Sequence, residues 1–313
     1  MNNLKLMTGA LLACAMIASC GKTSFKKTPG GMPYKLYKGK DTQTIKAGDY
    51  IQVSFTTKVN DSVLFTTADN PLPFIQFVSN QVRPYDISEI LQQMHVGDSV
   101  VATQMVDTFI KRSPNSVPPQ FRNGDKITMY FKILGKYASD SAARTAFETA
   151  SKQLVEKESK DIEKYLADKK ITTVKTKSGA YAEILQEGTG PKADSGMQAA
   201  VMYTGSTWAG TRFDSNQDKS FGHTDPYTFV TGTGGAVRGF DEGVMLLAKG
   251  GKARLYVPSM LGYGPDGNPP RIKPFEKLIF DIEVVDVQTP QAPKQPQQLP
   301  LPQNVDAAQP KNK

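Results

Sequence analysis

Residues 196–285 carry an ordered series of short motifs that specify the fold. In chain order they are Val201-Met202-Tyr203-Thr204-Gly205, Phe213-Asp214-Ser215, Pro226-Tyr227-Thr228-Phe229, Gly235-Ala236-Val237-Arg238-Gly239-Phe240-Asp241-Glu242-Gly243, Lys249-Gly250-Gly251-Lys252, Val257-Pro258, Gly262-Tyr263-Gly264 and Leu278-Ile279-Phe280-Asp281-Ile282-Glu283. Apolar and polar residues alternate in the last motif, which predicts a strand with one buried face. Singly, each aromatic residue is typical of a protein core. Together with the carboxylate of Asp214 and the phenol of Tyr263, they indicate a small apolar pocket with a few orienting polar groups.

These motifs resemble those of the FKBP family of peptidyl-prolyl cis-trans isomerases, and the resemblance covers this whole region. It implies an α+β fold in which an antiparallel β-sheet wraps around a short helix. It also implies catalytic residues, which are Asp214, Tyr263 and Phe213. The implied substrate-binding residues are Tyr203, Tyr227, Phe229, Val237, Phe240, Ile272 and Phe280.

The resemblance gives each of these residues a role around a substrate proline. Phe240 is expected to form the floor beneath the proline ring, with Val237, Tyr203, Phe229 and Phe280 as walls and Tyr227 and Ile272 at the rim. Tyr263 is expected to donate a hydrogen bond to a substrate carbonyl, while Phe213 and Asp214 face the twisting amide. The floor is usually Trp in the best-known members, so weaker binding of macrolide inhibitors is expected here. Arg271 and Lys273 occupy a loop that is typically more apolar and are expected to favour acidic or polar residues near the proline.

Residues 45–137 repeat the skeleton of residues 175–288. The matched pairs are Gly48 and Gly196, Phe55 and Tyr203, Phe65 and Phe213, and Met129 and Phe280. Asp214 corresponds to Thr66, and the loop of Tyr263 has no counterpart. We therefore predict two FKBP-like domains, of which the first is degenerate and binds clients, dimerises or spaces the enzyme from a membrane. Chance similarity between two small β-rich domains is the alternative.

Residues 138–174 are predicted to form a long amphipathic helical linker. Residues 139–168 lack Gly and Pro, and apolar residues recur at helical spacing at Phe147, Ala150, Leu154, Ile162 and Leu166. This stripe favours packing on a neighbouring domain; a homodimer through helix 139–168 or through the N-terminal domain is a further hypothesis. The charges from Glu156 to Lys164 are interpreted as a solvated helix face. Residues 289–313 are rich in Pro and Gln and are predicted to be a disordered tail.

The first residues resemble a bacterial lipoprotein leader. Residues 1–19 combine Lys5 with an apolar run from Leu6 to Ile17, which is too short for a lasting membrane span. Small residues then precede Cys20, the expected site of lipid attachment; an ordinary signal peptide is the alternative. Residues 20–44 are predicted to be a flexible tether. These features predict attachment to the bacterial cell envelope, at the outer membrane facing the periplasm or at the cell surface.

The composition of the 313 residues excludes several classes of function. Two Cys and two His residues are too few for a Cys/His metal cage, so no metal or other cofactor is expected. The net charge of +8 is spread along the chain without a dense basic cluster, which disfavours nucleic acid binding. His95 and His223 lack the sequence partners of a nucleophilic triad.

Three hypotheses of function remain. The leading one is a lipid-anchored prolyl isomerase of the cell envelope whose clients are proline-containing polypeptides. A non-catalytic or weakly catalytic chaperone or scaffold that binds such segments is the second. A purely structural envelope lipoprotein is the third, and it would not need Asp214 and Tyr263.

Overall fold

Two seven-stranded antiparallel β-sheets dominate the computed structural model, which describes residues 25–113, 115 and 117–290. Each sheet lies in its own unit, and the units divide at Glu148 and Thr149. The first sheet has the order β1-β2-β6-β7-β3-β4, with β5 paired to β3. Its strands are β1 (Lys26–Lys27), β2 (Pro33–Tyr37), β3 (Tyr50–Val59), β4 (Ser62–Thr66), β5 (Ile75–Phe77), β6 (Ser99–Met105) and β7 (Lys126–Tyr137). Two short helices, α1 (Ser88–Leu91) and α2 (Val106–Arg112), lie between them in the chain.

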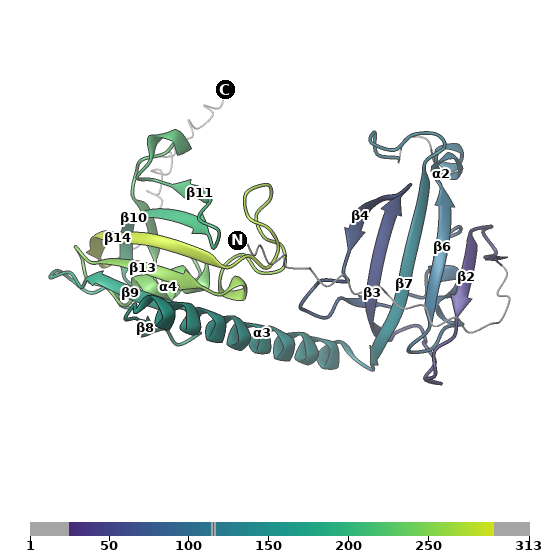
Figure 1. Ribbon diagram of the computed structural model, residues 1–313, viewed down its shortest axis with the longest axis horizontal. Helices are drawn as coiled ribbons and strands as arrows, with labels where there is room; N and C mark the ends of the chain where they lie inside the picture. The colour runs from purple at the N-terminus through teal and green to yellow at the C-terminus, as the bar shows by residue number, and fades with distance from the viewer. Residues whose placement is uncertain (1–24, 114, 116, 291–313) are drawn as a thin grey trace, which may run out of the picture. The chain divides into compact units, whose positions relative to one another are not determined.

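The second sheet has the order β8-β9-β13-β14-β10-β11, with β12 paired to β10. Its strands are β8 (Val174–Lys175), β9 (Tyr181–Gln186), β10 (Gln198–Thr207), β11 (Arg212–Ser215), β12 (Tyr227–Val230), β13 (Lys252–Val257) and β14 (Leu278–Gln288). The helical turns are η2 (Lys219–Phe221), α4 (Arg238–Val244) and η3 (Ser259–Leu261). Figure 1 shows both sheets and the short helix α4 beside β13.

The two sheets have the same strand order and share a register shift in the ladder between their long strands. The ladder between β3 and β7 shifts register at Gln52/Val53, and the ladder between β10 and β14 shifts at the equivalent Ala200/Val201. Phe55 pairs with Phe131 as Tyr203 pairs with Ile282, and Thr57 pairs with Met129 as Gly205 pairs with Phe280. The prediction of two FKBP-like α+β domains is therefore confirmed, because chance similarity would not reproduce the bulges as well as the strand order.

Alternation along the strands builds the core of the second domain. In β14, Leu278, Phe280, Ile282 and Val284 are buried while the residues between them are half-buried. Helix α4 contributes Phe240 and Val244 to the same core. Gly239 and Gly243 allow this helix to lie close to the sheet, since a Cβ at either position would approach the side chain of Val257 or Leu255 to 2.5 or 2.4 Å.

Helix α3 (Asp140–Lys169) has the length of the stretch 139–168 predicted from the sequence and begins and ends one residue later. Its buried residues Leu154, Ile162 and Leu166 follow the predicted stripe. Ile162 and Leu166 pack with Tyr181 and Tyr256 of the second sheet, so this half of the helix belongs to the second unit and is not a free linker (Figure 1). The predicted solvated face from Glu156 to Lys164 is wrong in part, because Glu158 and Ser159 are buried.

The structure also corrects the N-terminal boundary of the first domain. A flexible tether over residues 20–44 is wrong for its described part, because β2 pairs with β6 and buries Met32 and Tyr34. The predicted leader 1–19, Cys20 and nearly all of the tail 289–313 lie outside the described residues. Among the residues described, no helix is long and apolar enough to cross a membrane.

Candidate functional site

Four phenylalanine rings form the apolar centre of the candidate site. Phe213 on β11, Phe229 on β12, Phe240 on α4 and Phe280 on β14 are all buried. The ring of Phe280 meets those of Phe240 and Phe213 edge to face, with centroids 5.2 and 5.7 Å apart. The period-2 alternation of the strands and the start of α4 at Arg238 bring these rings together from four separate elements.

Tyr203 and Asp214 form a polar pair at the border of this cluster. The Tyr203 ring stands edge to face on Phe240 at 5.8 Å, and its hydroxyl donates to Asp214 Oδ2 at 2.5 Å. His223 Nε2 lies 2.8 Å from Asp214 Oδ1. Burial would raise the pKa of Asp214, but the hydrogen bonds from Tyr203 and His223 outweigh it and hold the pKa below its usual value. Burial and the bond to Asp214 raise the pKa of Tyr203.

Tyr263 approaches the same cluster from the loop that follows β13. Its ring is edge to face with Phe213 at 6.3 Å, and it is only partly buried. Burial, and then the negative charge of Asp214, raise the pKa of Tyr263, so its hydroxyl keeps its proton. Within the described residues this hydroxyl makes no hydrogen bond, which leaves it able to donate to a bound group.

The remaining predicted site residues differ in their surroundings. Val237 is partly buried at the start of α4 and packs against the core. Tyr227 is exposed, stacks on Phe229 and donates from its hydroxyl to the carbonyl of Gly235. Ile272 was expected at the rim, but it is 1% exposed and belongs to the core. The fold thus brings the predicted residues to one region, but Ile272 lies within the hydrophobic core of the domain and not at the rim of the site.

Two polar residues support the site in ways that the sequence did not reveal. His223 was set aside because it lacks a catalytic sequence motif, yet it contacts Asp214 across a loop. Arg271 is predicted to favour acidic or polar residues near the substrate proline; its Nη1 donates to the carbonyl of Phe213 at 2.7 Å, and its guanidinium lies over the ring of Phe221. Both contacts join a loop residue to strand β11, so no spacing in the sequence signals them.

The equivalent region of the first domain keeps aromatic rings and loses the polar groups. Phe55 replaces Tyr203, and its ring contacts Phe65 and Phe131, each at 6.1 Å. Phe65 is 45% exposed, whereas its counterpart Phe213 is 4% exposed. Thr66 stands where the second domain has Asp214, and its hydroxyl pairs with Thr56. This region offers apolar contact without the carboxylate and phenol of the second domain.

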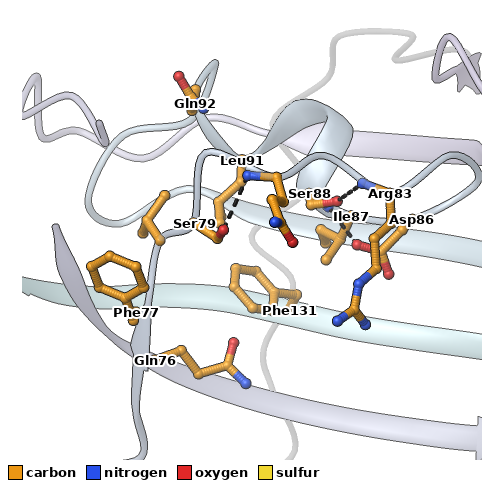
Figure 2. Close-up of a pocket in the computed structure, with 12 residues that line it drawn as sticks. Gln76, Phe77, Ser79, Arg83, Asp86, Ile87, Ser88, Leu91, Gln92 and Phe131 are labelled. Atoms are coloured by element: carbon orange, nitrogen blue, oxygen red, sulfur yellow. Dashed lines mark hydrogen bonds between the residues drawn. The ribbon is translucent and has the colours of Figure 1, made fainter. Parts of the chain in front are cut away.

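A cavity of about 310 Å³ lies in the first domain. Figure 2 shows side chains that line it, among them Phe77, Phe131, Ile87 and Leu91. Ile87 is the residue immediately before α1, whereas Phe240 of the second domain lies within the first turn of α4. Arg83 and Asp86 give the cavity a charged border. It is mixed in character and lacks the aromatic enclosure of the second domain.

The second domain has the features of an FKBP-type isomerase domain. These are a six-strand path with a seventh strand paired to β10, a short helix packed on the sheet, and a Tyr/Asp pair beside aromatic rings. Comparison with known proteins agrees. The family model for FKBP-type peptidyl-prolyl cis-trans isomerase matches residues 190–285. The FK506-binding protein of Neisseria meningitidis serogroup B (strain ATCC BAA-335 / MC58) is 40% identical over 109 residues, which are 35% of this chain and 96% of that protein.

The chloroplastic peptidyl-prolyl cis-trans isomerase FKBP16-3 of Arabidopsis thaliana is 34% identical over 36% of this chain and 51% of that protein. A crystal structure of the three FKBP domains of wheat FKBP73 covers 85% of this chain and 99% of that chain at 16% identity, with a TM-score of 0.34, too low for detailed comparison. The chain belongs to the FKBP-type peptidyl-prolyl cis-trans isomerase family.

Proposed function

We propose that the second domain accelerates isomerisation of X-Pro bonds in folding polypeptides through the site around Phe240, Asp214 and Tyr263. The observation that carries this proposal is the Tyr203–Asp214 hydrogen bond of 2.5 Å beside a buried aromatic cluster, with the Tyr263 hydroxyl uncommitted. Such a site supplies apolar contact for a proline ring and a donor for a carbonyl without any reactive nucleophile.

The chemistry of prolyl isomerisation requires little more. Amide resonance gives the bond a rotation barrier of about 18–20 kcal/mol, and X-Pro bonds isomerise in tens of seconds or longer. A catalyst has to bind the twisted amide more tightly than the planar one. Apolar rings disfavour the more dipolar planar form, and Tyr263 holds a neighbouring carbonyl. Each tenfold in rate needs about 1.4 kcal/mol, so a few such contacts are sufficient.

Turnover of a proline peptide by the full chain tests this site. We expect Asp214→Ala and Tyr263→Phe each to lower kcat/KM by about tenfold, the loss of roughly one favourable contact in the transition state. Asp286→Ala and Tyr256→Phe are matched controls, because both side chains make their polar contacts elsewhere in the domain. If both site variants match the wild type while circular dichroism shows an intact fold, the proposed site is wrong.

We further propose that the protein is a lipoprotein of the bacterial cell envelope, anchored through Cys20 and facing the periplasm. The support is the sequence alone: an apolar run from Leu6 to Ile17 followed by small residues and Cys20. Two or three acyl chains anchor stably, since each buried CH₂ contributes about 0.8 kcal/mol. Incorporation of a labelled fatty acid that is lost in Cys20→Ala is the expected result; equal labelling of both proteins contradicts it.

For the first domain we propose a second, non-catalytic activity, which is the binding of proline-containing clients. Exposed aromatic side chains support this idea, since Phe65 and Phe77 are 45% and 56% exposed. Phe65→Ser is expected to weaken suppression of client aggregation while peptide turnover stays unchanged.

Of the two predicted routes to a homodimer, we retain the first domain, because the apolar face of α3 packs on the second sheet within the chain. Light scattering on the full chain tests that route.

A further inference from the structure

Helix α3 carries one carboxylate that is buried against the second domain. Glu158 is 9% exposed, whereas its neighbours Glu156 and Lys157 are exposed. The carboxylate accepts two hydrogen bonds from Ser259, one from the backbone N at 2.6 Å and one from Oγ at 2.9 Å. Burial raises the pKa of Glu158, although both bonds from Ser259 oppose this. A carboxylate removed from water is costly unless it is hydrogen-bonded, so this contact fixes one specific arrangement.

Ser259 is the residue from which the Tyr263 loop is built. It is fully buried in the turn η3. Its carbonyl accepts hydrogen bonds from the backbone N of Gly262 at 3.0 Å and of Gly264 at 2.9 Å, the two residues that flank Tyr263. Tyr263 in turn meets the Phe213 ring. A continuous series of contacts therefore runs from Glu158 through Ser259 to the hydroxyl-bearing ring of the site.

The helix itself is held firmly enough to serve as an anchor. The Ser159 hydroxyl donates to the carbonyl of Gly179 at 2.9 Å, and Val155 packs against the core of the second domain. Ile162 is completely buried one turn further along. Residues 190–285 match the family model, so the helix that supplies Glu158 lies outside the matched part of the chain.

We propose that Glu158 is a positioning residue for catalysis, which holds the Tyr263 loop in its working geometry and makes helix α3 part of the isomerase unit. The inference rests on the proposed function, because it requires Tyr263 to take part in turnover. Glu158 touches no substrate; it acts through Ser259 and the backbone on either side of Tyr263.

Variants of the full chain at position 158 test the proposal. Glu158→Ala is expected to lower kcat/KM by about tenfold, in line with the loss of hydrogen bonds to a charged group. Glu158→Gln is expected to restore most of the activity, because its amide oxygen can accept from Ser259 N and its amide NH₂ can donate to Ser259 Oγ. Glu163→Ala is the matched control: Glu163 also lies on α3 and accepts from a side chain of the domain, Tyr181, but not from the Tyr263 loop. It is expected to retain wild-type turnover.

A double-mutant cycle separates positioning from general support of the fold. If Glu158 acts through Tyr263, Glu158→Ala loses most of its effect in a Tyr263→Phe background. Ser259→Ala, which removes only the Oγ contact, serves in the same cycle if Glu158→Ala does not fold. Effects that multiply independently in either cycle overturn the proposal, as does a wild-type rate for Glu158→Ala. A wild-type rate for Tyr263→Phe instead contradicts the proposed function, so the two failures are distinguishable.

Discussion

Gly205 shows how a single missing side chain shapes the candidate site. It pairs with Asp214 across the β10–β11 ladder and with Phe280 across the β10–β14 ladder. A Cβ at this position would lie 2.5 Å from Cζ of Phe213 and 3.1 Å from Cε1 of Phe280. The aromatic cluster can form only because this position of the strand carries no side chain.

Gly205→Ala is therefore expected to displace the Phe213 ring and to lower isomerase activity. It is also expected to lower the free energy of unfolding by about 1–3 kcal/mol, as overpacking does. Peptide turnover and thermal denaturation measure the two effects. Gly135→Ala is the matched control, because a Cβ there meets nothing closer than 3.9 Å. Full activity in Gly205→Ala would show that the ring can relax without cost.

His223, together with Tyr203, helps to lower the pKa of Asp214 through a hydrogen-bond contact. The pKa of Asp214 is lower in the folded protein than its usual value of 3.8, so the ionised form stabilises the fold above that value and this contribution is lost as the pH falls through the folded pKa. His223→Ala removes one of the hydrogen bonds that lower the pKa. We expect the acid limb of the kcat/KM profile to move to higher pH, and an unchanged limb would mean that His223 has no influence on Asp214.

At the scale of elements, helix α3 illustrates how an amphipathic pattern leaves its partner open. The stripe of Leu154, Ile162 and Leu166 is visible in the sequence. The pattern favours a neighbouring domain as the partner of this stripe, and a second copy of the helix is the alternative. In the structure Tyr165 packs on Trp208 at 5.1 Å and Ile162 packs with Tyr256, so the second sheet is the partner.

Ile162→Ala is expected to destabilise the second domain by about 2–5 kcal/mol, because its side chain is fully buried and the substitution leaves a cavity. Lys160→Ala, two residues earlier on the exposed side of the same helix, is expected to change stability little. Denaturant unfolding monitored by the fluorescence of Trp208 reports on this interface. Equal midpoints for the two variants would show that the helix does not support the domain.

At the scale of the whole molecule, one fold occurs twice with different chemistry. Both sheets share their strand order and the register shift in the ladder between their long strands, which depend on backbone pairing and buried apolar residues. The polar groups of the site, Tyr203 and Asp214, are not needed for strand pairing or for the apolar core, so other residues can replace them without loss of the fold. Phe55 and Thr66 in place of Tyr203 and Asp214 are such replacements.

Catalysis is accordingly expected to reside in the second domain alone. Thr66→Ala should leave kcat/KM within about twofold of the wild type, because surface changes outside a site cost little. Asp214→Ala at the equivalent position should lower it sharply. Measuring both in the full chain with the same proline peptide makes the comparison direct, and a large loss in Thr66→Ala would mean that the first domain also turns over substrate.

The sequence was sufficient for the architecture, and the aromatic residues that it predicts for the site lie together in the second domain. Strand alternation in residues 278–284, the turn before Phe240 and the paired motifs of the two domains are local patterns, and local patterns dictate which face of an element is buried. The strands at Lys26–Lys27 and Pro33–Tyr37 escaped prediction because short strands surrounded by Gly and Pro resemble a tether until β2 pairs with β6 and β1 pairs with β2.

Only the tertiary structure determined which side chains meet across long stretches of chain. Four observations are of this kind: Ile272 is buried, His223 contacts Asp214, Arg271 donates to the Phe213 carbonyl, and Glu158 accepts hydrogen bonds from Ser259. Glu158 lies in a run of charged residues whose pattern predicts solvent exposure. Hydrogen bonds between different elements depend on where the backbone returns in space, and that information is absent from residue spacing.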